Sequence, residues 1–202
     1  MRKKDFYKRN KSLIIISIIF IIFVIVGSCL NKMDSSNLDN ISNQIGKISS
    51  YYDGNINKKD FIFTNIKEYI RYLGLIGLGT LFFFTYPVAI IVFIVKAMSI
   101  GYTIELAAYS WNLVYGIQII TMLFAIVFLK NIVIVPMSII LIELSIGYIK
   151  SVYKQLKKNR QDSIVSLGKE FVLNLIIIMC ASIILQSILN IISISIIQFL
   201  AR

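Results

Sequence analysis

The chain has 202 residues, of which 57% are hydrophobic and 15% are charged, and its 21 lysines and arginines against 10 acidic residues give a net charge of +11. Soluble domains carry about 25% charged residues, and here the charges gather between long uncharged runs, so composition argues against a soluble protein. The basic residues flank apolar runs, as positive cytoplasmic loops do in membrane proteins, so the expected partner is the lipid bilayer and no nucleic acid.

The first predicted span covers residues 13–30, an uncharged apolar run behind the basic tail 1–12. About 20 apolar residues are enough to cross a bilayer. Because basic flanks stay inside the cell, the tail is predicted to be cytoplasmic.

The end of this run also supports a second interpretation. Residues 26–29 read Val-Gly-Ser-Cys and resemble a lipoprotein signal, in which cleavage before Cys29 would remove the first span. The other interpretation is an uncleaved signal-anchor that ends in small residues. The uninterrupted run, and the glycine at position 27, favour the anchor.

Residues 31–72 are predicted to form an extracytoplasmic loop and a short helix. The first part, to residue 60, is rich in Ser, Asn and Asp and lacks the apolar residues for a core. Residues 61–72 place their apolar side chains near one helical face. They are predicted to form an interfacial helix, or else the polar end of the next span.

The remaining spans follow from the apolar runs. The second is predicted over 73–95, closed by Lys96, and the fourth over 132–149. The region 97–129 is too long for one straight span and short for two. It must cross once to keep both its ends on the required sides, so it is predicted to be bent, half-helical or re-entrant.

A second basic segment, 150–170, precedes the last span, 171–199, and is predicted to be cytoplasmic. The sequence therefore predicts an all-α membrane helix bundle of about five transmembrane helices. Its N-terminus is expected in the cytoplasm and its C-terminus outside. The whole chain forms one membrane domain.

The residues for catalysis are few. The chain contains no histidine, and Cys29 and Cys180 form no Cys-x-x-Cys pair. Serine–histidine dyads and histidine–carboxylate metal sites are thereby excluded, and every aspartate lies outside the apolar runs. We expect no catalytic residue, no metal, no cofactor and no enzymatic activity.

Some polar residues nevertheless fall within the apolar regions. Glu105 and Glu143 are the acids expected at membrane depth, where they could relay protons or contact a partner helix. Glu105 could instead lie near the cytoplasmic interface, solvated or packed against backbone. Asn174, Gln186 and Asn190 mark one side of the last span, and such residues commonly join helices by hydrogen bonds.

From Phe63 onward the chain resembles the stage II sporulation protein M family, integral membrane proteins of endospore-forming bacteria. The resemblance rests on the order and spacing of short motifs over about two-thirds of the chain. Its positions are Phe63, Asn65, Tyr72, Gly74, Lys96, Gly101, Asn131 and Pro136. Ala97 departs from the pattern, which usually has glycine after the lysine, and a proline expected two residues before Asn131 is missing.

The resemblance implies a non-enzymatic scaffold in forespore engulfment. In that family the protein anchors sporulation proteins D and P, which degrade peptidoglycan, at the engulfing septal membrane of the mother cell. Because aromatic anchors contribute most to binding, the expected partner contacts are Phe61, Phe63, Tyr69 and Tyr72. The alternative is a transporter or permease subunit with a broken helix at 97–129, although the chain shows no convincing internal repeat.

Overall fold

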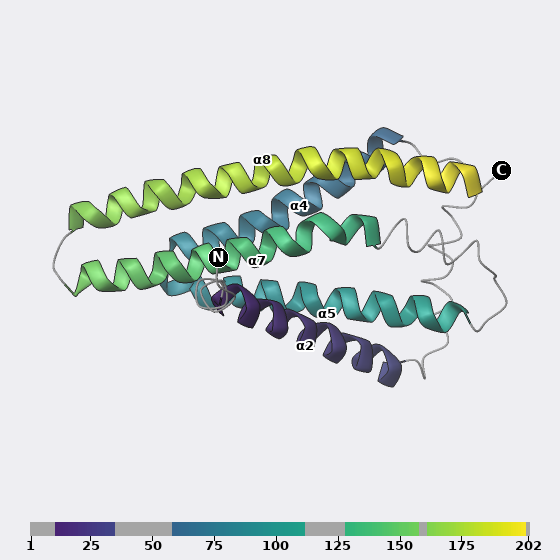
Figure 1. Cartoon of the computed structure of the whole chain (residues 1–202), viewed down its shortest axis with the longest axis horizontal. Helices are drawn as coiled ribbons and strands as arrows, with labels where there is room; N and C mark the ends of the chain where they lie inside the picture. Colours follow the sequence, from purple (N-terminus) through teal and green to yellow (C-terminus); the bar gives the residue numbers. More distant parts are fainter. Residues whose placement is uncertain (1–10, 35–57, 112–127, 158–160, 201–202) are drawn as a thin grey trace, which may run out of the picture.

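The computed structural model describes residues 11–34, 58–111, 128–157 and 161–200. They form long helices joined in one place by a 3-10 turn (Figure 1). The elements are α2 (Lys11–Asp34), α4 (Lys58–Leu81), η1 (Phe83–Thr85), α5 (Tyr86–Trp111), α7 (Leu129–Leu156) and α8 (Gln161–Leu200). The all-α prediction is confirmed for the part of the chain described.

Four of these helices, α2, α5, α7 and α8, are long and apolar enough to cross a membrane. The prediction of a membrane-embedded helical protein is supported to that extent. Helix α4 has a polar first half, with charges from Lys58 to Arg71, and turns apolar only from Tyr72. Its apolar part alone is shorter than the bilayer requires.

The predicted boundary at Lys96 is wrong. Helix α4 ends at Leu81 and α5 begins at Tyr86, so the break lies inside the range 73–95, and Lys96 is in the middle of α5. The hydroxyl of Thr85 lies within hydrogen-bonding distance of the carbonyl oxygens of Gly79 and Phe82, 2.9 and 2.8 Å away. It thus satisfies carbonyl groups that a helix end leaves without partners.

Pro87 fits this arrangement because the first turn of a helix needs no backbone N–H donor there. Gly79 lies against Ala89 and the Thr85 carbonyl, which lets the two helices approach closely just beyond the turn. A charge at residue 96 ended the predicted span, but glycine and proline mark where the backbone actually reverses.

Two other predicted segments belong to continuous helices. Residues 61–72 continue directly into 73–81 within α4, which favours the polar end of a longer helix over a separate interfacial one. The predicted loop 150–170 is mostly helix, since α7 runs to Leu156 and α8 starts at Gln161. Charges can stop a span without stopping its helix, because helices continue readily in water when their faces stay packed.

The other boundaries lie partly outside the described residues. Residues 97–111 form the regular second part of α5, and the rest of the predicted bent segment, 112–127, is not described. The predicted loop 31–60 begins as the end of α2 and finishes as the start of α4, and residues 35–57 between them are not described.

The helices pack in two groups (Figure 1). Helices α2 and α5 lie side by side and run in the same direction, while α4, α7 and α8 form the second group. Helix α4 joins the groups because it packs against both α5 and α8. The shared core includes Tyr69, Leu73, Ile76, Ile134 and Leu141.

The helix ends gather at the two ends of the bundle. The start of α2, the α4–α5 turn, and the end of α7 with the start of α8 lie toward one end of the bundle (Figure 1). The opposite end holds the end of α2, the start of α4 and the C-terminal part of α8.

Candidate functional site

The contact between α2 and α5 depends on two glycines. A Cβ added to Gly27 would collide with the backbone carbonyl of Met98, and one added to Gly101 would collide with that of Val24. Ala97, one turn before Gly101, is fully buried. Small residues four apart let membrane helices approach closely and gain van der Waals contact. Gly27 therefore has a packing role that does not require a lipoprotein signal.

The carboxylates singled out in the sequence both accept hydrogen bonds from serines of α2. Ser28 donates to Glu105 over 2.9 Å, and Ser12 donates to Glu143 over 2.7 Å. Asn31 adds a bond to the carbonyl oxygen of Tyr102 at 3.2 Å. These bonds fasten α2 to α5 near one end and to α7 near the other.

Glu105 thus lies far along α5 from Tyr86, beside the C-terminal half of α2. This is the opposite end of the bundle from the basic start of α2 (Figure 1). The alternative that Glu105 lies near the cytoplasmic interface stays a prediction, and with a cytoplasmic N-terminal tail this position disfavours it. That alternative followed from taking Lys96 as a span end, when α5 continues straight through that residue.

A second polar group joins α4, α7 and α8 through amides. The side-chain oxygen of Asn190 accepts bonds from Asn65 at 3.3 Å and from Gln186 at 3.1 Å. The Gln186 amide also reaches the carbonyl oxygen of Leu129 at 3.5 Å. Gln186 and Asn190 are almost completely buried. Asn174 is half-buried and three turns away along α8, so it lies outside this group.

A charged group lies beside the amides, between α4, α5 and α7. The ammonium of Lys130 is 2.5 Å from the carboxylate of Glu68, and the Tyr69 hydroxyl donates to the backbone carbonyl of Lys130. The ammonium of Lys96 lies over the ring of Tyr72, 5.8 Å from its centroid. Lys130 repels this ammonium and Glu68 attracts it. We call Glu68, Lys96 and Lys130 the charged triad.

The sequence did not predict the triad. Lys96 was predicted to close the second span, and neither Glu68 nor Lys130 was a candidate site residue. One signal was available, because Glu68 and Tyr72 are four residues apart and so share a face of α4. Nothing in the spacing indicated that α5 and α7 would bring lysines to that face.

The family-motif positions fall into distinct environments. Asn65, Tyr72 and Gly101 are buried within the bundle, and Lys96 is half-buried over Tyr72. Asn131 is half-buried in the first turn of α7, and a Cβ added to Gly74 would meet nothing within 4 Å. Phe63 and Pro136 are exposed. The motif thus marks mainly positions where helices meet.

Two of the expected partner contacts are wrong. Tyr69 and Tyr72 are buried in the bundle core and so are unavailable to another protein. Phe61 is half-buried, whereas Phe63 exposes 69% of its surface. The prediction failed because an apolar helical face binds its own bundle first.

Within the described ranges, no three His, Cys, Asp or Glu side chains lie close enough together to hold a metal ion. Cys29 and Cys180 are exposed free thiols. The chain was also compared with protein-family models, curated proteins and solved structures, and none of them matches.

Proposed function

We propose that this chain is a non-enzymatic, multi-pass scaffold of the cell membrane that anchors a peptidoglycan-degrading complex during forespore engulfment. One observation carries the proposal: Glu105, Glu143, Gln186 and Asn190 each hydrogen-bond to a different helix from their own. Polar side chains used in this way hold membrane helices together. They leave the bundle a rigid platform whose ends can bind partners.

The scaffold crosses the membrane five times, with its N-terminus in the cytoplasm and its C-terminus outside. Support comes from the basic segments, since the start of α2 and the lysine-rich end of α7 lie toward the same end of the bundle (Figure 1). Positive segments remain in the cytoplasm. The return crossing that α2 and α5 need to run in the same direction is assigned to α4, whose polar first half, too hydrophilic to face lipid, packs against other helices through Asn65 and Tyr69.

The partners proposed are the peptidoglycan hydrolases, sporulation proteins D and P, and the location is the engulfing membrane of the mother cell. The resemblance to the stage II sporulation protein M family supports both. Phe63 is the aromatic that fits a partner contact, because it is exposed near the start of α4, at the extracytoplasmic end of the proposed topology. Exposed aromatics often anchor protein interfaces.

The experiment is affinity capture of the tagged full-length chain from engulfing cells, with partners identified by mass spectrometry. The wild type should capture cell-wall hydrolases. Glu105→Gln should retain them, because an amide oxygen still accepts the Ser28 bond. Loss of capture with Phe63→Ser, at a normal protein level, would locate the contact. Capture without any hydrolase would refute the scaffold.

The charged triad favours one other function, a transporter or permease subunit. Lys96 lies midway along a membrane helix, and ionisable residues at such depth commonly mark substrate or ion pathways. The same capture experiment separates the two functions. A transporter subunit would bring down an ATPase or a substrate-binding protein, and Glu105→Gln or Glu143→Gln would abolish its activity while leaving its abundance normal.

A further inference from the structure

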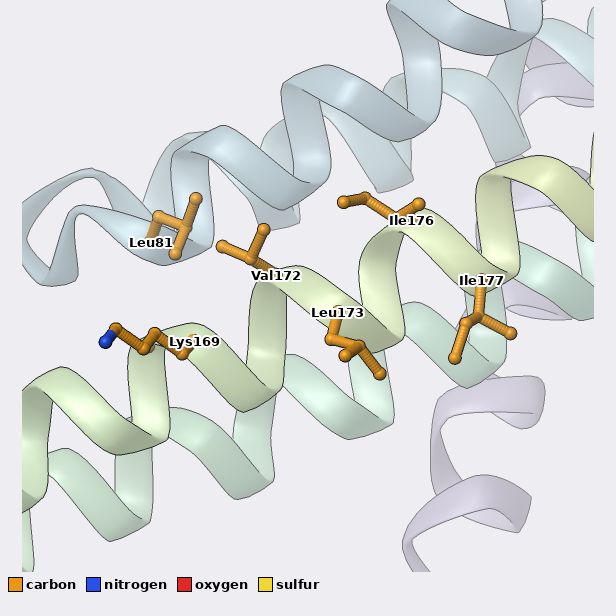
Figure 2. Close-up of a pocket in the computed structure, with 7 residues that line it drawn as sticks. Leu81, Lys169, Val172, Leu173, Ile176 and Ile177 are labelled. Atoms are coloured by element: carbon orange, nitrogen blue, oxygen red, sulfur yellow. The ribbon is translucent and has the colours of Figure 1, made fainter.

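A shallow groove of about 550 Å³ lies where the end of α4 meets the first half of α8. Figure 2 shows Leu81 of α4 and Val172 of α8 directed toward each other across it, with Lys169 at one end of the row along α8 and Ile177 at the other. Leu173 and Ile176 complete the apolar lining. Gly168 also lines the groove, beside Lys169.

Along α8 the charge of Lys169 comes first and the apolar lining follows, as the charged headgroup of a phospholipid is followed by its acyl chains. Lys169 and Glu170 are the last charged residues before the uncharged run 171–199, so the ammonium of Lys169 is expected at the boundary between headgroups and hydrocarbon. Ile176 is seven residues further, about 10 Å deeper along the helix axis. Leu173, Ile176 and Ile177 are each more than half exposed within the chain. An acyl chain beside them would keep this surface away from water.

The aliphatic stem of Lys169 lines the groove, and its ammonium, which points away from the apolar residues in Figure 2, determines the class of headgroup beside the groove. Glu170, the neighbouring acid, does not line the groove, and the last turns of α7 and its C-cap add Lys150, Lys154 and Lys157 to the same end of the bundle. A lysine at headgroup level favours anionic lipids, and basic pockets between membrane helices bind their phosphates. A zwitterionic headgroup would bring its own cation close to Lys169.

We propose that this groove binds one anionic phospholipid, with its phosphate on Lys169 and an acyl chain along Val172, Leu173 and Ile176. The site is independent of the scaffold proposal, because its chemistry requires only that α8 cross a membrane. It adds a lipid preference to this end of the bundle, so the protein would favour membrane regions rich in anionic lipid.

Native mass spectrometry of the full-length protein, with added phosphatidylglycerol or phosphatidylcholine of identical chains, tests the site. The wild type should retain phosphatidylglycerol about fivefold better. Lys169→Gln should remove that preference and leave phosphatidylcholine binding unchanged. The matched control is Lys154→Gln, an exposed lysine outside the groove, which should keep the preference.

Val172→Trp fills the groove and should weaken retention of both lipids, while glycerol phosphate should not compete because it lacks acyl chains. Melting temperatures establish that each variant is folded. Equal retention of the two lipids by the wild type would overturn the proposal. So would an equal loss of preference in Lys169→Gln and Lys154→Gln, since diffuse surface charge would then explain it.

Discussion

Gly101 illustrates how much of this bundle depends on single residues. Gly101→Ala would press a methyl group into the Val24 carbonyl, and overpacking of this kind costs about 1–3 kcal/mol. We expect a lower melting temperature in detergent for Gly101→Ala. The loss should be accompanied by weaker disulfide cross-linking between cysteines introduced across the α2–α5 contact.

Gly74→Ala is the matched control, because an added Cβ there meets nothing within 4 Å. Alanine is a better helix former than glycine by about 1 kcal/mol, so this variant should be as stable as the wild type or more stable. If the two alanine variants melted at the same temperature, the close α2–α5 contact would be refuted.

The charged triad makes a prediction about coupling between residues. Glu68→Gln would leave Lys96 and Lys130 facing each other without a carboxylate and should lower stability. Both members of the Glu68–Lys130 pair are partly exposed, so about 1 kcal/mol is expected for their interaction. Lys130→Gln added to Glu68→Gln should restore part of the loss, because one of the two repelling charges is then gone.

The measurement is a double-mutant cycle of melting temperatures at low and high salt. Non-additivity that shrinks with salt is expected. Strictly additive losses, unchanged by salt, would show that the triad residues do not interact.

The sequence indicated several of the polar side chains that join helices, but it did not indicate which residues they contact. Gln186 and Asn190 stood out as amides in an apolar run, and they do join helices. Their partners Asn65 and Leu129 belong to other helices, and no local spacing relates those segments. Ser28 and Ser12 could not be assigned to the two glutamates for the same reason.

The α4–α5 turn gives a test at the level of elements. In the structure Phe84 is 91% exposed in the turn, whereas a span over 73–95 would bury it at mid-membrane. Phe84→Cys, in a cysteine-free background, should react with a permeant thiol reagent, and with an impermeant one only after the cells are opened. A cysteine at Ser36 should react with the impermeant reagent in intact cells.

A cysteine at Ser163 serves as the cytoplasmic control and should behave like the one at Phe84. Protection of Phe84→Cys from both reagents would restore the original boundary at Lys96. Reaction with the impermeant reagent in intact cells would invert the proposed topology.

Helix existence was predictable and helix limits were not. Within the described residues the apolar runs are helical apart from the break at 82–85, because a membrane leaves a spanning backbone few other ways to satisfy its hydrogen bonds. The break at 82–85 was not predicted, because the charge of Lys96 was used to end the span although Gly79 and Pro87 lie nearer the actual turn. Lys96 is accommodated inside the bundle by the ring of Tyr72, a contact that depends on the tertiary arrangement.

For the whole molecule, composition was sufficient to predict an all-α membrane protein, and four described helices suit a membrane. The pairing of α2 with α5 could not be predicted from the sequence, since the two helices are separated by α4 in the chain and no local pattern relates them. Nothing in an apolar pattern states which helices are neighbours. Tertiary packing therefore decides which aromatic residues of α4 are buried, such as Tyr69, and which are exposed, such as Phe63.

The central claim is that this protein positions cell-wall hydrolases and performs no chemistry itself. The most direct measurement follows fluorescent hydrolase partners and septal thinning in engulfing cells with and without the chain. The account predicts that without it the partners disperse in the membrane and the septal wall persists, while the extracted enzymes remain active. Partners that localise normally while septal thinning still fails would contradict it.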